Sequence, residues 1–250
     1  MKIKGSPFKD WVVGGNEAEK FIGTDAIDHI ASMGGNDYID AGAGKDIVYA
    51  GAGDDLVYGG LDNDLLVGEA GNDEIHGGSG NDGVYGGGGN DQIFGEKGND
   101  VLVGDGGNDY ISGDVGDDVI RGMTGDDKLD GGEGNDTITG GMGTDYMYGG
   151  EGRDTFVWTF ADSFLKNGKP LETMDHVADF SKEDVLDLSG MFGKMSLGEA
   201  LDHIKLEDNG EGTIIHVQAV EGRDWAQVAI LENFHISDDK ELWANDMLII

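Results

Sequence analysis

Apolar residues recur at every ninth position over about half of this 250-residue chain. From Ile39 to Phe156, one apolar side chain stands two residues after each of fourteen aspartates, and glycine-rich segments separate the apolar positions. The block 86–94, Gly-Gly-Gly-Gly-Asn-Asp-Gln-Ile-Phe, is typical. Only three residues of each block favour a strand, because glycine weakens strands and permits sharp turns. The pattern predicts a stack of very short strands joined by tight turns, in which the apolar side chains form one continuous interior.

The fourteen aspartates are the candidate binding residues. They are Asp37, Asp46, Asp55, Asp64, Asp73, Asp82, Asp91, Asp100, Asp109, Asp118, Asp127, Asp136, Asp145 and Asp154. In a regular stack they would form columns at its edges, where neighbouring carboxylates repel one another. Ca²⁺ removes this repulsion, since it accepts six to eight oxygens from carboxylates and from the carbonyls that tight turns expose. The aspartates could instead serve only as turn residues, but a fixed period of nine disfavours that interpretation.

The block pattern G-G-x-G-x-D-x-U-x, where U is apolar, resembles the calcium-binding nonapeptide of the repeats-in-toxin (RTX) family. The resemblance implies an all-β fold: a parallel β-roll, or calcium solenoid, with two nonapeptides per coil, followed by a β-rich C-terminal region with short helices. Ligand pairs would then lie eighteen residues apart. Two columns of seven aspartates leave six gaps each, so we expect about twelve Ca²⁺ ions.

Three segments follow from this resemblance. Residues 1–31 would form an N-terminal cap with degenerate repeats, 32–157 the nonapeptide β-roll, and 158–250 a C-terminal β-rich capping and secretion-signal region. Terminal repeats of a solenoid are usually atypical, because they close the stack against water. We expect Trp11, Val12, Val13 and Phe21 to form the N-terminal plug.

Two features of the roll depart from the simple pattern. Asp62 replaces a turn glycine, and Met33, Glu69, Glu96, Asp105, Asp114 and Met123 occupy the second position of their blocks. We expect a weakened turn at Asp62 but no break, because aspartate tolerates left-handed geometry. The second-position residues are expected to affect the regularity of individual sites but not the roll. The outward positions of one predicted sheet are largely apolar: Ile47, Tyr49, Leu65, Val67, Tyr85, Val101, Val103 and Val119. Such a face needs cover. We favour the C-terminal region as that cover, with a partner, a second copy or a polysaccharide as alternatives.

After Thr155 the nine-residue period ends. We expect strands at 155–160, 174–180 and 185–188, a helix at 196–203, a hairpin of 213–220 with 225–231, a helix at 238–245 and a strand at 247–250. The segments 154–157, 175–180 and 184–189 resemble the block that follows RTX repeats in type I secretion passengers. The tail Asp246–Ile250 resembles the uncleaved C-terminal secretion signal found in giant bacterial RTX adhesins. The resemblance leaves open whether Asp175 and Asp179 bind a further Ca²⁺ or only cap turns, and the same question applies to Asp28.

The charge of the chain restricts its partners. Fifty-one acidic residues against sixteen basic ones give a formal charge of −35. Nucleic acid is excluded as a partner, because phosphate binding needs a basic surface. Anionic membranes are disfavoured, and the sequence has no apolar run long enough for membrane insertion. Without metal the acidic, glycine-rich repeat is typical of a disordered chain, so calcium is expected to be a condition for folding.

The sequence gives no indication of an active site. It has no H-E-x-x-H motif, no G-x-S-x-G motif and no cysteine, so zinc-protease, serine-hydrolase and thiol chemistry lack their residues. The abundant carboxylates could hide a glycosidase pair, but the repeat accounts for most of them. We therefore predict a protein that is not an enzyme.

Two functions are consistent with this pattern. The first is a calcium-binding module that folds outside the cell and carries a type I secretion signal, as the C-terminal part of a bacterial RTX adhesin. Its location would be secreted or on the bacterial cell surface, and the type I secretion machinery would be its partner. The alternative is an accessory tail, capable of holding polysaccharide, of a secreted enzyme such as an alginate epimerase, lipase or protease. Outward threonines are too few for an ice-binding solenoid.

Overall fold

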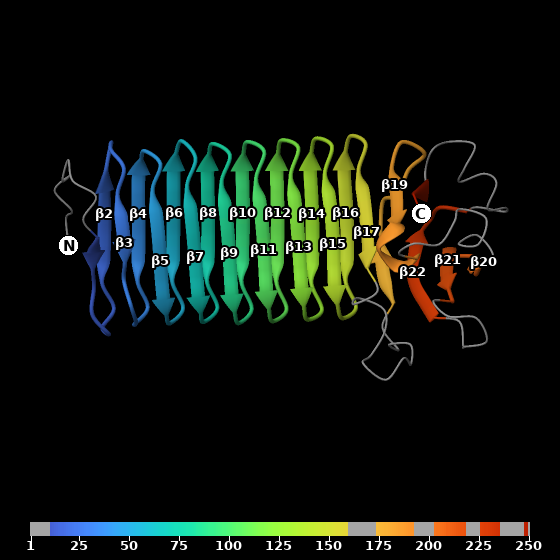
Figure 1. Cartoon of the computed structure of the whole chain (residues 1–250), viewed down its shortest axis with the longest axis horizontal. Coiled ribbons are helices and arrows are strands. Elements are labelled where there is room, and N and C mark those ends of the chain that lie inside the picture. Colours follow the sequence, from blue (N-terminus) through green and yellow to red (C-terminus); the bar gives the residue numbers. More distant parts are fainter. Residues whose placement is uncertain (1–10, 160–173, 193–202, 219–225, 236–247, 250) are drawn as a thin grey trace.

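The computed structural model describes residues 11–159, 174–192, 203–218, 226–235 and 248–249. Most of these residues form a flattened parallel β-solenoid of about eight turns, with two strands in each turn (Figure 1). Of the described residues, only the four of α2 (Ser189–Phe192) are helical. The predicted all-β, parallel roll is therefore confirmed. No helix in the described ranges is long and apolar enough to cross a membrane.

Even-numbered strands build one sheet, which we call sheet A. Its roll strands are β2 (Lys20–Thr24), β4 (Tyr38–Ala43), β6 (Leu56–Leu61), β8 (Glu74–Ser79), β10 (Gln92–Lys97), β12 (Tyr110–Val115), β14 (Lys128–Glu133) and β16 (Tyr146–Glu151). Each pairs in parallel with the strand eighteen residues away, as in Ile93 with Ile111. The coil of two nonapeptides, which the family resemblance implied, is thus observed.

Within the roll, the odd-numbered strands build the opposite sheet, sheet B. Its roll strands are β1 (Val12–Val13), β3 (His29–Ala31), β5 (Ile47–Ala52), β7 (Leu65–Ala70), β9 (Gly83–Gly88), β11 (Val101–Gly106), β13 (Val119–Thr124), β15 (Thr137–Met142) and β17 (Thr155–Thr159). Between β4 and β16 every strand has six residues, not three. Parallel pairing continues through the glycine positions, as in Gly51 with Glu69, so the prediction of three-residue strands was too short.

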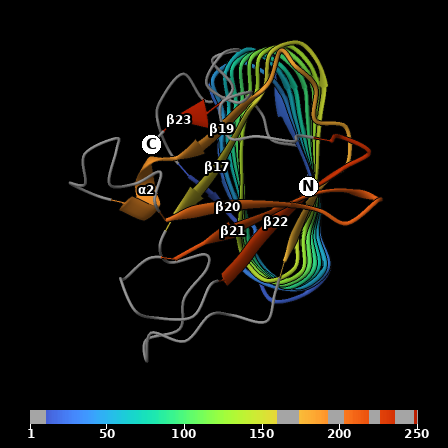
Figure 2. The same cartoon turned by 90° about the vertical axis from the view of Figure 1, so that its right-hand side faces the viewer.

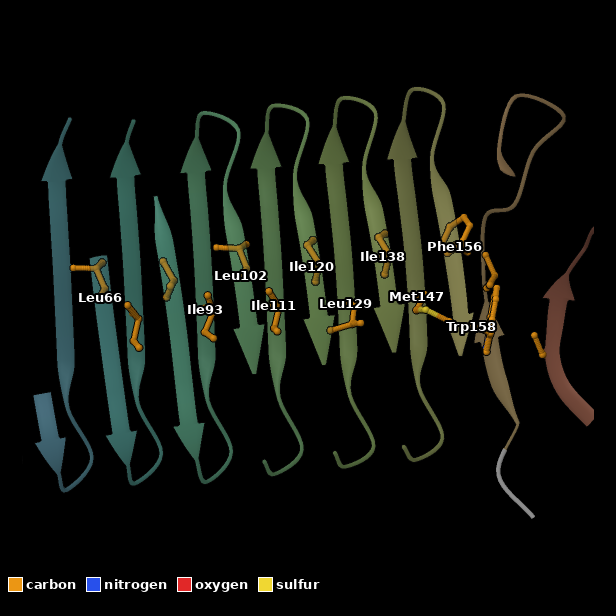
Figure 3. Packing of buried hydrophobic residues seen from close by; sticks show 14 of the residues in the cluster. Leu66, Ile93, Leu102, Ile111, Ile120, Leu129, Ile138, Met147, Phe156 and Trp158 are labelled. Carbon is orange, nitrogen blue, oxygen red and sulfur yellow. The ribbon is translucent and has the colours of Figure 1, made fainter. Parts of the chain in front are cut away.

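The interior is one row of apolar side chains from each sheet (Figure 3). The apolar residue two places after each column aspartate, from Ile39 to Phe156, is fully buried. Each coil therefore buries two such side chains against those of its neighbours. Removing these side chains from water is the main apolar contribution to the fold, but two per eighteen residues leave little to offset the ordering of so many glycines. The roll needs a second source of stability.

Irregular turns are accommodated as expected. Asp62 takes a φ of 74°, and the six other non-glycine residues at second positions lie between 67° and 82°. Strand pairing continues on both sides of Asp62. The left-handed region is unfavourable for side chains other than glycine, aspartate and asparagine, so these turns are strained but unbroken.

The C-terminal region continues both sheets and then covers the end of the roll (Figures 1 and 2). β18 (Asp175–Val177) extends sheet A, and β19 (Val185–Leu188) extends sheet B. β20 (Ile204–Asp208), β21 (Gly212–Val217) and β22 (Ala226–Glu232) form an antiparallel meander whose last strand pairs with β18. β23 (Leu248–Ile249) pairs with β19. Phe156, Trp158 and Phe180 close the apolar interior at this end.

Most of the predicted C-terminal strands are present. The strands near 155–159, 175–177 and 185–188, the 212–217/226–232 hairpin and the terminal strand are confirmed. β20 was not predicted; its residues directly follow the helix that was expected at 196–203. Most of that helix, and the one expected at 238–245, lie outside the described residues.

The N-terminal plug is smaller than expected. Phe21 is buried, but Trp11 and Val13 are 45% and 57% exposed. The register of β1 explains the difference, since Val12 pairs with Ile30, an inward residue, and its two neighbours therefore point outward. Trp11 packs against the rings of His29 and Tyr49 on the outer surface of sheet B.

Within the described residues, the C-terminal region does not provide the expected cover of the apolar outer face. The described part of the C-terminal region lies at the end of the stack, beyond β17, and not over β5 to β13 (Figure 1). Tyr85 on this face is 36% exposed. Strand pairing explains the placement of the described segments, because β18 and β19 continue the two sheets along the axis of the solenoid and do not turn back over its outer face.

Candidate metal centre

All fourteen candidate aspartates occupy equivalent places, at the end of a turn and directly before a strand. Those preceding sheet A form one column, and those preceding sheet B form the other. Within each column the main-chain N–H of one aspartate donates to Oδ1 of the aspartate eighteen residues later, at 2.7–2.9 Å. The structure thus brings the predicted residues together as two continuous ladders.

The second carboxylate oxygen of each aspartate is left without a partner. All fourteen side chains are at most 5% exposed, and in all fourteen the Oδ2 atom is buried with no hydrogen bond from any described residue. Native proteins leave few buried polar atoms unsatisfied, because desolvation of such an atom is costly. Fourteen equivalent cases in one repeat indicate that these edges of the roll are built to bind cations.

Main-chain oxygens lie beside these atoms. A Cβ on Gly104 would collide with Oδ2 of Asp109, and it would stand 2.9 Å from the carbonyl oxygen of Gly122, one coil further on. Ten other blocks, from Gly59 to Gly149, place the aspartate oxygen in the same way, and a side chain at this glycine would displace it. No group of three acidic or histidine side chains converges on one point in the described chain. A cation here would therefore be held by carboxylates completed by carbonyls, a donor set that suits Ca²⁺.

Electrostatics of the metal-free columns oppose ionisation. Burial, partly offset by the hydrogen bond from the preceding coil, raises the pKa of Asp64, Asp73, Asp100, Asp118 and Asp127 from 3.8 to about 7. The same causes raise the pKa of Asp46, Asp55, Asp91, Asp136 and Asp154 to about 6. Repulsion between neighbouring aspartates adds to the effect in these residues. At neutral pH the columns need either protons or cations.

Both columns end in carboxylates that the protein itself satisfies. At the N-terminal end, Oδ2 of Asp28 accepts hydrogen bonds from the main chain and hydroxyl of Thr24, at 2.7 and 2.9 Å. At the C-terminal end, Asp145 N–H donates to Asp175 Oδ1, and the Trp158 indole N–H donates to Asp175 Oδ2 at 2.7 Å. In the described part of the chain, buried carboxylate oxygens without a hydrogen bond therefore occur only in the fourteen repeat aspartates.

Asp184 and Asp179, like Asp175, accept hydrogen bonds on both carboxylate oxygens. Asp154 N–H donates to Asp184 Oδ1, and Ser181 N–H donates to Asp184 Oδ2. Both oxygens of Asp179 accept main-chain N–H groups, from Gly149 and Gly150, at 2.9 Å. These bonds favour the capping alternative for Asp175 and Asp179, and those to Thr24 favour it for Asp28.

A second ladder on the surface was missed in the sequence. The side chains just before the column aspartates are mostly asparagine or aspartate, and their Oδ1 atoms accept main-chain N–H groups from the next coil at 2.8–3.3 Å. Asn90, for example, accepts from Asn108. The excess of asparagine at this position, from Asn36 to Asn135, was the signal that could have identified it.

At acidic pH, protons bound to the column aspartates are expected to stabilise the roll partly in place of calcium. Because the folded columns have raised pKa values, the folded state binds more protons than the unfolded chain between about pH 4 and pH 7. The stability of the metal-free roll therefore falls as pH rises through this window. In excess chelator, a change from pH 7.5 to pH 5 should restore part of the far-UV β signal. With calcium present the same change should weaken folding, since protons compete for the ligands. A chelated chain that is equally unfolded at both pH values would contradict this.

Comparisons with known proteins agree with this geometry. The model of the RTX calcium-binding nonapeptide repeat matches in four copies, at residues 22–57, 58–93, 85–120 and 121–156, which together span more than half of the chain. No curated protein matches the sequence.

Solved structures that match this chain include two subunits of one enzyme. The AlgE6R2 subunit of the Azotobacter vinelandii mannuronan C5-epimerase has 22% identity and a TM-score of 0.39, with 66% of this chain and 91% of that chain covered. The AlgE6R3 subunit has 22% identity and a TM-score of 0.32, covering 74% and 78%. The extracellular lipase LipA from Serratia marcescens has 16% identity and a TM-score of 0.32, covering 96% of this chain and 42% of that chain.

Proposed function

Because this chain belongs to the family of RTX calcium-binding nonapeptide repeats, we propose that its fourteen column aspartates are the calcium ligands on which folding depends. The observation that carries the proposal is the set of fourteen buried Oδ2 atoms without partners. Each ion would lie between successive aspartates of one column, with carbonyls of the turns completing the ligand set. Twelve such intervals exist, each bridged by one Asp N–H to Asp Oδ1 bond, so we propose about twelve ions.

Bound calcium would supply the positive charge and the oxygen bonds that hold one coil to the next. Without it, the column carboxylates repel and their desolvation is uncompensated. About twelve ions would reduce the formal charge of −35 to roughly −11. The aspartates would therefore act as a switch between an extended chain and a closed roll. The β-roll is a structural module, and we assign no catalytic role to it.

We further propose that this switch serves export. The segments 1–31, 32–157 and 158–250 would act as N-terminal cap, calcium-dependent roll, and C-terminal cap with secretion signal, as in the C-terminal part of a bacterial RTX adhesin. Calcium inside cells is too low to fill sites of the affinity found in extracellular modules, so the chain would stay open until it leaves. In the folded chain Leu248 and Ile249 pair with β19, so the tail would be accessible to a type I secretion machinery only before folding.

Export is tested by attaching residues 155–250 to a cytosolic reporter in a host with a type I secretion system. Secretion should require the last four residues, Met247 to Ile250, and a matched fusion ending at residue 246 is the control. In the full chain, Asp100→Ala with Asp118→Ala should lower the secreted yield of folded protein. Calcium-driven folding outside the cell would normally prevent the chain from moving back into the secretion channel, and these changes weaken that folding. Asp54→Ala with Asn72→Ala, on the surface ladder, should lower the secreted yield less. Equal secretion with and without the tail would overturn the export proposal and leave calcium binding untouched.

A further inference from the structure

The outer face of sheet B is almost free of charge, although the chain carries 51 acidic residues. In the strands from β3 to β17, two outward positions form rows along the solenoid, one from His29 to Thr155 and one from Ala31 to Val157. No residue of either row is acidic, and Arg121 is the one with a permanent positive charge. The corresponding rows of sheet A contain both acidic and basic residues. A second acidic molecule would therefore meet the least repulsion on sheet B.

The middle of this face is apolar and has an aromatic ring at its centre. Three consecutive coils place Val67, Tyr85 and Val103 side by side. Gly83 leaves a hollow beside the Tyr85 ring, since a Cβ on Gly83 would stand 3.8 Å from that ring. The ring thus has room to lie across the sheet, and it is still 36% exposed. Exposed tyrosine surrounded by aliphatic side chains is typical of the centre of a protein interface.

The face is also regular. From β3 to β15 its strands pair at a constant step of eighteen residues. The coils of the roll lie one over the other along the solenoid axis (Figure 2). Adjacent strands of an ordinary sheet are rotated by about 20–25°, so a twisted partner would touch only part of this face. A second copy of the chain has the same shape and the same strand spacing of about 4.8 Å, so its side-chain rows match along the whole face.

The size of the face is sufficient for a dimer. Strands β3 to β17 of sheet B lie about 4.8 Å apart and extend over about 34 Å, while six residues at about 3.3 Å each give a width of about 20 Å. These dimensions correspond to roughly 700 Å² in each copy, or roughly 1,400 Å² in total. Specific protein interfaces bury about 1,200–2,000 Å² in total, so this face meets the requirement.

Arg121 and Glu69 lie on this face without an ion-pair partner among the described residues. Both side chains are exposed, Arg121 in β13 and Glu69 at the third outward position of β7, at the edge of the face. Strands β7 and β13 are three coils apart in sheet B, a distance of about 14 Å. This distance is too long for an ion pair within one copy. The face therefore presents one positive and one negative group that a partner can pair.

We propose that the outer face of sheet B is the interface of a two-fold symmetric dimer of this chain, formed by the calcium-bound roll. The axis would run parallel to the strands and pass between β9 and β11, in the middle of the face. Strand β9 would then lie opposite β11 of the second copy, and β7 opposite β13. Tyr85 would pack on Val103 of the second copy, and Arg121 would reach its Glu69. Two-fold symmetry would make each of these contacts twice.

The charges favour this axis over the other one that brings the two faces together. With an axis along the solenoid, β13 would lie opposite β13, so the two Arg121 side chains would approach each other and Glu69 would have no positive partner. With the axis parallel to the strands, Arg121 meets Glu69. Asp105, the other acidic residue at the edge of the face, then lies opposite Gly87. No like charges meet, as an interface between two acidic chains requires.

The test is sedimentation equilibrium of the full chain in millimolar calcium. At about 100 µM it should give twice the mass of the chain, with a Kd below roughly 10 µM, since interfaces of this size reach micromolar affinity or better. Tyr85→Glu should raise this Kd at least roughly ten-fold, because it would bury two carboxylates near each other at the centre of the interface. Tyr146→Glu, at a ring on sheet A that is 44% exposed, is the matched control and should leave the Kd unchanged.

A charge exchange tests the arrangement of the two copies. Arg121→Glu and Glu69→Lys should each raise the Kd roughly three- to ten-fold, because like charges would then face each other. The double variant should return to within about two-fold of the parent Kd, since the pair is exchanged and not removed. Glu96→Lys is the control for Glu69→Lys, because Glu96 occupies the equivalent position of sheet A with a similar φ of 71°.

Circular dichroism in calcium separates dimerisation from folding. All variants should keep the calcium-induced β signal, because their side chains lie outside the buried interior. If Tyr85→Glu fails to fold, the charge exchange at exposed positions provides the test. A folded chain that is monomeric at about 100 µM would assign the face to another occupant and overturn the proposal. Weakening by the sheet A variants alone, open-ended larger species, or a double variant that does not recover would also overturn it. None of these results bears on calcium-dependent folding.

Discussion

Chelation of calcium is expected to convert most of the far-UV β-sheet signal of this chain into that of a disordered chain. The reason lies in the columns, where fourteen carboxylates are buried with one oxygen each unpartnered. Paired apolar side chains alone cannot hold so glycine-rich a roll, and the metal-free carboxylates oppose closure. Millimolar Ca²⁺ should restore the signal, since calcium modules that work outside cells have affinities in the range 10⁻⁴–10⁻³ M. Circular dichroism during a calcium titration measures the effect.

Magnesium at the same concentration should not restore the fold. It requires a small octahedral site and loses its water reluctantly, whereas these sites offer carboxylates and turn carbonyls in fixed positions. Asp100→Asn with Asp118→Asn should shift the calcium midpoint upward by removing two adjacent charges of one column. The matched change on the surface, Asp117→Asn with Asp126→Asn, should shift it less, because these side chains are exposed. A chain that is equally folded in chelator and in calcium would contradict the prediction.

The roll itself could be predicted because every coil repeats the same local chemistry. One apolar residue per nine, with an aspartate two places before it, determines both the buried row and the carboxylate columns. Pairing over eighteen residues places these positions on top of one another, so a single block contains most of the information. The sequence did not reveal how the two oxygens of each aspartate differ. Oδ1 accepts the N–H of the preceding coil, while Oδ2 has no hydrogen-bond partner. This difference arises from the way the coils stack in three dimensions.

The ends of the roll could not be predicted in the same way, because they depend on contacts that occur once. Trp158 was expected to lie in a strand, but its bond to Asp175 joins residues on opposite sides of the segment 160–173. Asp175 and Asp184 continue the columns with a step of thirty residues in place of eighteen. The nine-residue repeat pattern cannot predict such a step. Likewise, Trp11 and Val13 are apolar, as residues of an N-terminal plug would be, but the alternation of side chains along β1 places them on the outer surface.

The capped column ends imply that the C-terminal region forms without metal and provides a template for the roll. Each coil of a linear stack depends on its neighbours, so a preformed end lowers the cost of adding the next coil. The antiparallel strands β20 to β22 and the buried residues Phe156, Trp158 and Phe180 give this end a conventional apolar core. Here Asp175 and Asp184 obtain from Trp158 and Ser181 the hydrogen bonds that repeat aspartates lack.

Deletion of residues 179–250 is therefore expected to abolish calcium-induced folding or to raise its calcium midpoint strongly. Deletion of one internal coil, residues 92–109, is the matched control, since it joins Asp91 to Tyr110 and keeps both columns in register. It should lower the amplitude of the β signal and change the midpoint little. Trp158→Phe tests the cap more finely, because it keeps a ring in the core and removes the N–H that satisfies Asp175 Oδ2. The buried oxygen left behind should cost about 1–3 kcal/mol of folding free energy. Adding Asp175→Asn should not make the loss larger, because the amide carries no charge to bury. Equal midpoints for the two deletions would show that the roll closes without a template, and the capped ends would then be only its boundary.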